Sequence, residues 1–62
     1  MAEYILEGQM RLGAPWRELQ RTTHRREAMD LFEAGRRHWP DCTRFRIIDA
    51  QGEVIFETFA DQ

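Results

Sequence analysis

The chain has 62 residues, a formal net charge of −2 and hydrophobic residues at 42% of its positions. A chain this short predicts a single domain over residues 1–62, with a thin core that depends on good packing or on self-association. The slightly negative charge disfavours a general nucleic-acid binder, because such proteins are usually strongly basic.

Cys42 is the only cysteine, so the sequence excludes an intrachain disulfide and the disulfide framework of small secreted proteins. The first ten residues, MAEYILEGQM, contain Glu3 and Glu7 and lack the basic start that is typical of a signal peptide. The apolar runs are too short for a membrane-spanning helix. We therefore expect a cytoplasmic location and no membrane partner.

A β-hairpin is predicted for the N-terminal third of the chain. In the segment YILEGQMRL, residues 4–12, every second residue from Tyr4 to Leu12 is apolar or glycine, and the polar Glu7, Gln9 and Arg11 lie between them. This alternation is typical of a half-buried strand. GAP at 13–15 is typical of a turn, and WRELQRT at 16–22 is typical of a second strand.

One helix is predicted for HRREAMDLFEAGRRHW, residues 24–39. Thr22 and Thr23 precede it as candidate N-cap residues, and Pro40 ends it because proline lacks an amide proton. At helical spacing one stripe collects the residues expected to face a sheet: Ala28, Leu31, Phe32, Gly35 and Trp39. Since glycine lowers helix stability by about 1 kcal/mol relative to alanine, we expect Gly35 to serve a close approach of helix and sheet.

The segment 43–59 predicts a second hairpin, whose register has two solutions. A three-residue loop with Gly52 as the bulge glycine pairs Asp49 with Glu53 and suits the turn chemistry. A tighter turn pairs Asp49 with Gly52 and places Arg44 opposite Glu57. It also collects four apolar side chains on one face: Phe45, Ile47, Val54 and Phe56. Because a slip of one residue inverts the faces, the hydrophobic pattern favours the tighter turn.

These elements predict an α+β fold of order ββαββ, with one four-stranded antiparallel sheet and a single helix packed on one face. No element remains to cover the other face of the sheet. That face must therefore be polar, or dimerise, or bind something else.

Metal binding and catalysis find little support in the residue spacing. His24 and His38 fall at opposite ends of the predicted helix, roughly 20 Å apart, so they cannot share an ion. His38, Asp41 and Cys42 are close in sequence but match structural zinc spacing poorly. The glycines are isolated and no paired carboxylates stand out, which argues against a phosphate loop and acid–base catalysis. We expect no metal, no cofactor and no enzymatic activity, with Cys42 as a semi-buried packing residue.

All nine basic residues are arginines, and those of the predicted helix fall into two groups. Arg36 and Arg37 occupy the last turn, where the helix dipole favours positive charge. Arg25 and Arg26 occupy the first turn, where the same dipole disfavours it. Two ion pairs are expected at helical spacing, Glu33–Arg37 and Arg26–Asp30. Because helix stability does not explain Arg25 and Arg26, these two are the better candidates for contacts with a partner.

Several features of the chain resemble a loose group of very short phage and prophage accessory proteins. In chain order they are a strand ending near Gly8, Pro15–Trp16, Thr22 before RREA at 25–28, a helix closing at Trp39–Pro40, and the strand Phe45–Arg46–Ile47. Some proteins of this group inhibit bacterial defence systems, CRISPR effectors among them, by binding them. The resemblance implies no catalytic residues. The nearly balanced charge departs from acidic inhibitors that mimic nucleic acid.

We therefore expect a non-enzymatic protein-interaction module, a phage-type inhibitor or adaptor that binds a host defence protein such as a CRISPR effector. The alternative is a small nucleic-acid-binding module that uses six arginines: Arg25, Arg26, Arg36, Arg37, Arg44 and Arg46. A homodimer is also expected, on the uncovered sheet face or an edge strand, with Trp16 and Phe59 available to it. The residues expected to bind a partner are Arg25, Arg26, Arg36, Arg37, Trp39, Arg44, Arg46, Ile48 and Ile55.

Overall fold

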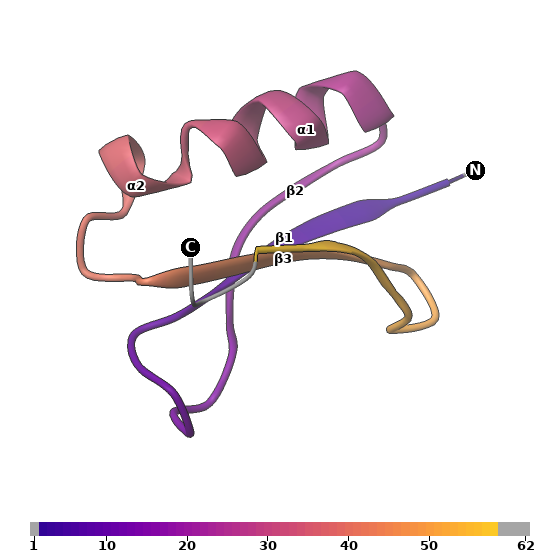
Figure 1. Ribbon diagram of the computed structural model, residues 1–62. Coiled ribbons are helices and arrows are strands. Elements are labelled where there is room, and N and C mark those ends of the chain that lie inside the picture. The colour runs from indigo at the N-terminus through magenta and orange to yellow at the C-terminus, as the bar shows by residue number, and fades with distance from the viewer. Residues whose placement is uncertain (1, 59–62) are drawn as a thin grey trace.

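Four strands and two helical segments make up the computed structural model, which describes residues 2–58. In chain order they are β1 (Tyr4–Gln9), β2 (Arg17–Thr22), α1 (Arg25–Glu33), α2 (Gly35–His38), β3 (Arg44–Asp49) and β4 (Val54–Glu57). The strands form one antiparallel sheet in the order β2-β1-β3-β4. Both helical segments lie on the same side of this sheet (Figure 1). The predicted α+β class and four-stranded antiparallel sheet are confirmed.

The two central strands, β1 and β3, carry the core. Leu6, Phe45 and Ile47 are the largest fully buried side chains, each at most 2% exposed. Ala28 from α1 and Cys42 from the loop before β3 complete the buried cluster. The side chains predicted to form the helical stripe all pack here: Ala28 and Gly35 are buried, and Leu31, Phe32 and Trp39 are partly buried.

The first strand is shorter than its sequence pattern predicts. β1 ends at Gln9, whereas the alternation continues to Leu12. Met10 and Leu12 lie in the following turn, where they are 43% and 79% exposed. The chain reverses there with Gly13 at φ 89°, a conformation that glycine adopts without steric cost. A two-residue period cannot signal this reversal, since the turn residues happen to continue it.

The predicted helix is interrupted at Ala34, whose ψ of 5° lies well away from the helical value of about −42°. The single predicted helix is thus two segments, with α2 redirected toward β3. The helix also starts later than expected, because the N-cap residue is His24 and neither Thr22 nor Thr23. Thr22 still contributes, since its hydroxyl accepts a hydrogen bond from the His24 amide at 3.2 Å and donates one to Glu27.

Gly35 lies where the helical layer comes closest to the sheet. A Cβ added at this position would stand 2.9 Å from the Phe45 ring, closer than real Cβ contacts come. The close helix–sheet approach expected from the sequence is confirmed.

The second hairpin combines the two registers that the sequence left as alternatives. Asp49 pairs with Glu53 across a three-residue loop, and Gly52 has φ 84°, so the tighter turn favoured by the hydrophobic pattern is wrong. The Asp49 carboxylate fixes this loop by accepting the amides of Gln51 and Glu53, both at 2.9 Å. A bulge at Ile55 then shifts the pairing by one residue, so that Phe56 pairs with Ile47. This bulge returns Phe56 to the apolar face that the pattern required.

No helix among residues 2–58 is long and apolar enough to cross a membrane.

Gly35→Ala should destabilise the protein even though alanine favours helix formation. The added methyl group must displace the Phe45 ring, and overpacking of this kind costs about 1–3 kcal/mol. Thermal unfolding of Gly35→Ala should therefore show a lower midpoint than wild type. In a Phe45→Leu background the same substitution should cost less, because the ring atoms that the methyl group meets are gone. Equal costs in both backgrounds would contradict the assigned contact.

Candidate functional site

The sheet face turned away from the helices, called the open face below, carries its residues in rows across the strands. Ile5, Ile48 and Val54 are register partners and form an aliphatic row. Beside it lies a charged row of Glu18, Glu7, Arg46 and Glu57. Gln9 and Arg44 form the next row. The assignment follows from strand alternation, because the intervening Leu6, Phe45 and Ile47 are in the core on the helical side.

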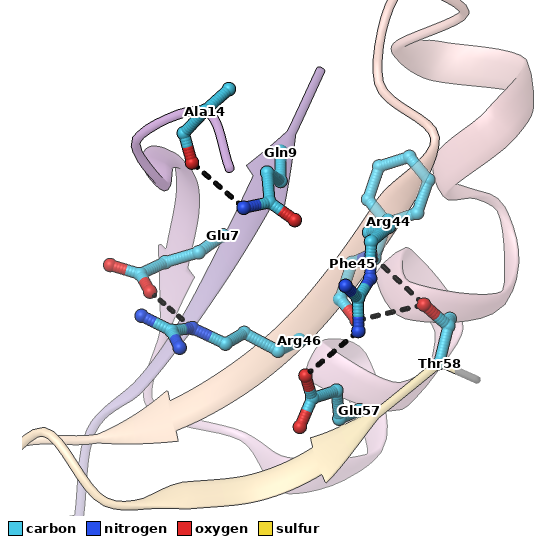
Figure 2. Close-up of polar contacts among 8 residues, drawn as sticks. All are labelled: Glu7, Gln9, Ala14, Arg44, Phe45, Arg46, Glu57 and Thr58. Carbon is cyan, nitrogen blue, oxygen red and sulfur yellow. Dashed lines mark hydrogen bonds and ion pairs between the residues drawn. The ribbon is translucent and has the colours of Figure 1, made fainter. Parts of the chain in front are cut away.

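Ion pairs link the charged side chains of this face. Arg46 Nε lies 2.8 Å from Glu7, and Arg44 lies 3.4 Å from Glu57 (Figure 2). Arg21 on β2 pairs with Glu18 at 2.7 Å and with Glu3 at 3.0 Å. The charged part of this face therefore supplies its own counter-charges.

Trp16 adds a stacking contact to this network. The guanidinium carbon of Arg46 lies 4.1 Å from the centroid of its ring, within the range of a cation–π interaction. Arg46 is thus held by an indole and by the Glu7 carboxylate. Both Arg46 and Glu7 are largely covered, with side chains only 24% and 16% exposed.

The open-face arginines expected to bind a partner are therefore engaged within the chain. Arg44 was expected to face Glu57, and the ion pair forms although Glu57's register partner is Arg46. Ile48 lies on the open face as expected. Ile55 occupies the β4 bulge and packs against the core cluster, so the sequence did not place it correctly at the open face. Phe59 lies outside the described residues.

The arginines of the helical layer have different surroundings. Arg26, Arg36 and Arg37 are exposed, and within residues 2–58 none of them forms an ion pair. Arg25 is also exposed, and its guanidinium lies over the Phe56 ring, 5.3 Å from the centroid.

The two ion pairs predicted along the helix, Glu33–Arg37 and Arg26–Asp30, are absent from this part of the chain. The interruption at Ala34 removes the regular spacing that the pair of Glu33 and Arg37 requires.

The end of α2 forms a basic corner, defined here as Arg36, Arg37, His38 and Trp39. Arg36, Arg37 and His38 are exposed and make up the last turn of α2. Trp39 is half-buried against the core, with the His38 ring edge-on to it at a centroid distance of 5.6 Å. The corner thus combines two exposed arginines with one aromatic ring that packs against the core.

Cys42 is a packing residue. Its side chain is buried, and a Cβ added at Gly8 would come within 2.8 Å of its sulfur, so the thiol sits directly against β1. Among the described residues, no three His, Cys, Asp or Glu side chains are grouped so as to hold a metal ion.

Gln9 is a polar residue whose burial the sequence pattern did not reveal. It is 6% exposed, and its amide group donates to the Ala14 carbonyl at 2.7 Å, which ties the β1–β2 turn back to the strand (Figure 2). Its Oε1 and the Nε of its register partner Arg44 are both buried without a hydrogen-bond partner in the described region. The alternation places Gln9 on the polar face, but burial there comes from the turn folding over it.

Glu7→Gln should destabilise the protein more than Glu18→Gln does. Neutralising Glu7 leaves Arg46 without its charge partner in a largely covered position, which costs about 1–3 kcal/mol. Glu18 pairs at an exposed site, where ion pairs contribute about 0–1 kcal/mol. Urea unfolding of the two variants measures the difference. A larger loss for Glu18→Gln would contradict the assignment of Arg46 as the covered arginine.

The Arg21 pair predicts a pH effect at Glu18. A hydrogen bond from Arg21 lowers the pKa of the Glu18 carboxyl below its ordinary value of 4.5. Because the folded-state pKa is the lower one, this contribution to stability is present above pH 4.5 and is lost as the pH falls through the folded-state value. In Arg21→Ala, an NMR titration should show the pKa of Glu18 rising toward 4.5, whereas Arg17→Ala should leave it in place.

Comparison with protein-family models, with curated proteins and with solved structures finds no match for the chain. What bears on function is therefore the distribution of charge and exposure over its own surface.

Proposed function

We propose that the chain is a non-enzymatic protein-interaction module that presents the arginines of its helical layer to an acidic surface of a partner protein. One observation carries the proposal. Arg21, Arg44 and Arg46 on the open face are paired with glutamates of the same chain, whereas Arg26, Arg36 and Arg37 of the helical layer are exposed outside such pairs in the described region. The exposed arginines keep their hydrogen-bonding capacity for another molecule.

The basic corner is the centre of the proposed contact. Arginine and tryptophan are enriched where interfaces concentrate their binding energy, and the corner holds Arg36 and Arg37 beside Trp39. Trp39 is anchored against the core, so little conformational freedom is lost when a partner covers it. A net charge of −2 disfavours binding to any polyanion, so a local acidic patch is the better match.

A protein partner is favoured over nucleic acid by the surroundings of the same arginines. Exposed Glu27, Asp30 and Glu33 lie along α1 between Arg26 and the basic corner, and carboxylates repel a phosphate backbone. Arg44 and Arg46, which the nucleic-acid alternative needs, would have to leave Glu57 and Glu7. The resemblance to short phage accessory proteins adds a class of partner, a host defence protein such as a CRISPR effector that this chain inhibits.

Purified CRISPR effector complexes provide the test, with binding measured by biolayer interferometry and inhibition by DNA cleavage. The double variant Arg36→Ala/Arg37→Ala should weaken binding at least about tenfold, since interface arginines rank among the residues most costly to truncate. Arg11→Ala/Arg17→Ala removes the same charge from two exposed arginines outside the basic corner and should leave binding unchanged.

The same preparations should be titrated with duplex and single-stranded DNA at low and high salt. Strong, salt-sensitive DNA binding that Arg36→Ala/Arg37→Ala abolishes would favour the nucleic-acid alternative. Equal weakening by both double variants would contradict a contact centred on the basic corner.

A further inference from the structure

The turn between β1 and β2 exposes two large apolar side chains, Met10 and Leu12. Leu12 is 79% exposed and Met10 is 43% exposed, the former being the most exposed large hydrophobic residue in the described chain. Arg11 stands between them, exposed and outside the ion pairs of residues 2–58. We call residues 10–12 the apolar tip.

The apolar tip is held in place by hydrogen bonds at its base. Gln9 donates to the Ala14 carbonyl at 2.7 Å, and the Ala14 amide donates to the Arg11 carbonyl at 3.0 Å. From the other side, the Thr43 hydroxyl donates to the Met10 carbonyl at 3.0 Å. The tip is therefore preorganised, and exposing Leu12 is a property of the fixed turn. A preorganised apolar projection loses little entropy when another surface covers it.

A hollow of about 420 Å³ lies at the other end of the molecule, where the N-terminal segment, the start of α1 and the β3–β4 turn meet. Its apolar lining includes Tyr4, Ala50 and Ile55, and its acidic lining consists of Glu3 and Asp49. In Figure 1 the β1–β2 turn and the β3–β4 turn point away from each other at opposite ends of the sheet.

The charges around the two features are complementary. Arg11 adjoins Leu12 on the tip, whereas the hollow offers the carboxylate of Asp49; its other acidic residue, Glu3, already pairs with Arg21 of the same chain at 3.0 Å. The backbone amides of Gln51 and Glu53 both donate to Oδ1 of Asp49, which leaves its Oδ2 to accept from a guanidinium. Arg25, the single cation of the lining, is drawn over the Phe56 ring.

We propose that the apolar tip of one copy of this chain docks in the hollow of a second copy, with Leu12 against Tyr4 and Ile55 and Arg11 at the Asp49 carboxylate. Because the two surfaces differ and lie at opposite ends, the contact is head-to-tail and grows into rings or short chains rather than a closed two-fold dimer. The area is small, so the association is weak and transient. It uses neither the basic corner nor the open face and is independent of the proposed function.

Intermolecular paramagnetic relaxation tests the contact directly. A nitroxide on Arg17→Cys, close to the tip, is mixed at millimolar concentration with ¹⁵N-labelled wild-type chain that carries no label. Wild-type chain treated with the same reagent shows that the buried Cys42 stays unmodified. Selective broadening of the Ala50, Gln51 and Ile55 amides supports head-to-tail docking.

Variants separate this contact from other modes of association. Leu12→Ser in the spin-labelled chain removes the central apolar contact. We expect the affinity of the association, obtained from the broadening as a function of concentration, to fall at least about tenfold. Val54→Ser removes another exposed aliphatic residue, on the open face, and should change nothing. Both side chains are exposed, so both variants fold, which dispersed amide spectra verify.

Four outcomes would overturn the proposal. Three are no intermolecular broadening, broadening centred on Ile5 and Ile48 of the open face, and loss of broadening in Val54→Ser. A fourth is binding of the tip to phosphatidylglycerol vesicles without self-association, which would assign Leu12 to a lipid surface.

Discussion

A chain with one helical layer can cover one face of its sheet, and the other face must be made compatible with water by its own side chains. On the open face the main such contact joins Arg46 on β3 to Glu7 on β1 and to Trp16, the residue just before β2. Cross-strand pairs of opposite charge stabilise a sheet by about 0.2–1 kcal/mol each. Here they also neutralise charges that would otherwise stand unpaired beside the aliphatic row of Ile5, Ile48 and Val54.

Both edge strands carry a bulge, and the two bulges have the same effect. The pairing of β1 with β2 shifts after Leu6 and leaves Leu19 unpaired, and Leu19 packs against the core beside Gly8. On β4 the extra residue is Ile55, which also packs against the core. Each bulge thus adds an aliphatic side chain to the helical face without a longer strand. It also distorts a sheet edge, which hinders pairing with another chain.

The bulges explain which parts of the fold follow from the sequence and which do not. Alternation and helical spacing predict the element order, both hairpins and the buried stripe from Ala28 to Trp39, because each depends on a repeat over many residues. A bulge is one extra residue and leaves no trace in such a repeat. The second hairpin shows the result, since turn chemistry and hydrophobic pattern excluded each other until Ile55 reconciled them.

The candidate surfaces were predictable to a similar degree. The arginines of the helix could be assigned to its exposed side from spacing alone, and Arg44 could be paired with Glu57. The engagement of Arg46 by Glu7 and Trp16 depends on how β1 lies against β3, and this long-range pairing has no local signal. For the same reason Met10 and Leu12, read as strand residues, gave no indication of an exposed turn.

Stability and recognition draw on different arginines in this arrangement. On the open face Arg44 and Arg46 pair with glutamates, and Arg46 also stacks on Trp16, so their substitution acts first on folding. Arg36 and Arg37 of the basic corner are exposed and form no ion pair in the described region. Substitutions at surface positions of this kind usually change stability by less than about 0.5 kcal/mol. The helical layer can therefore change its charge pattern while the sheet keeps the fold. In a chain this small, that separation would leave the proposed binding surface free to vary with its partner.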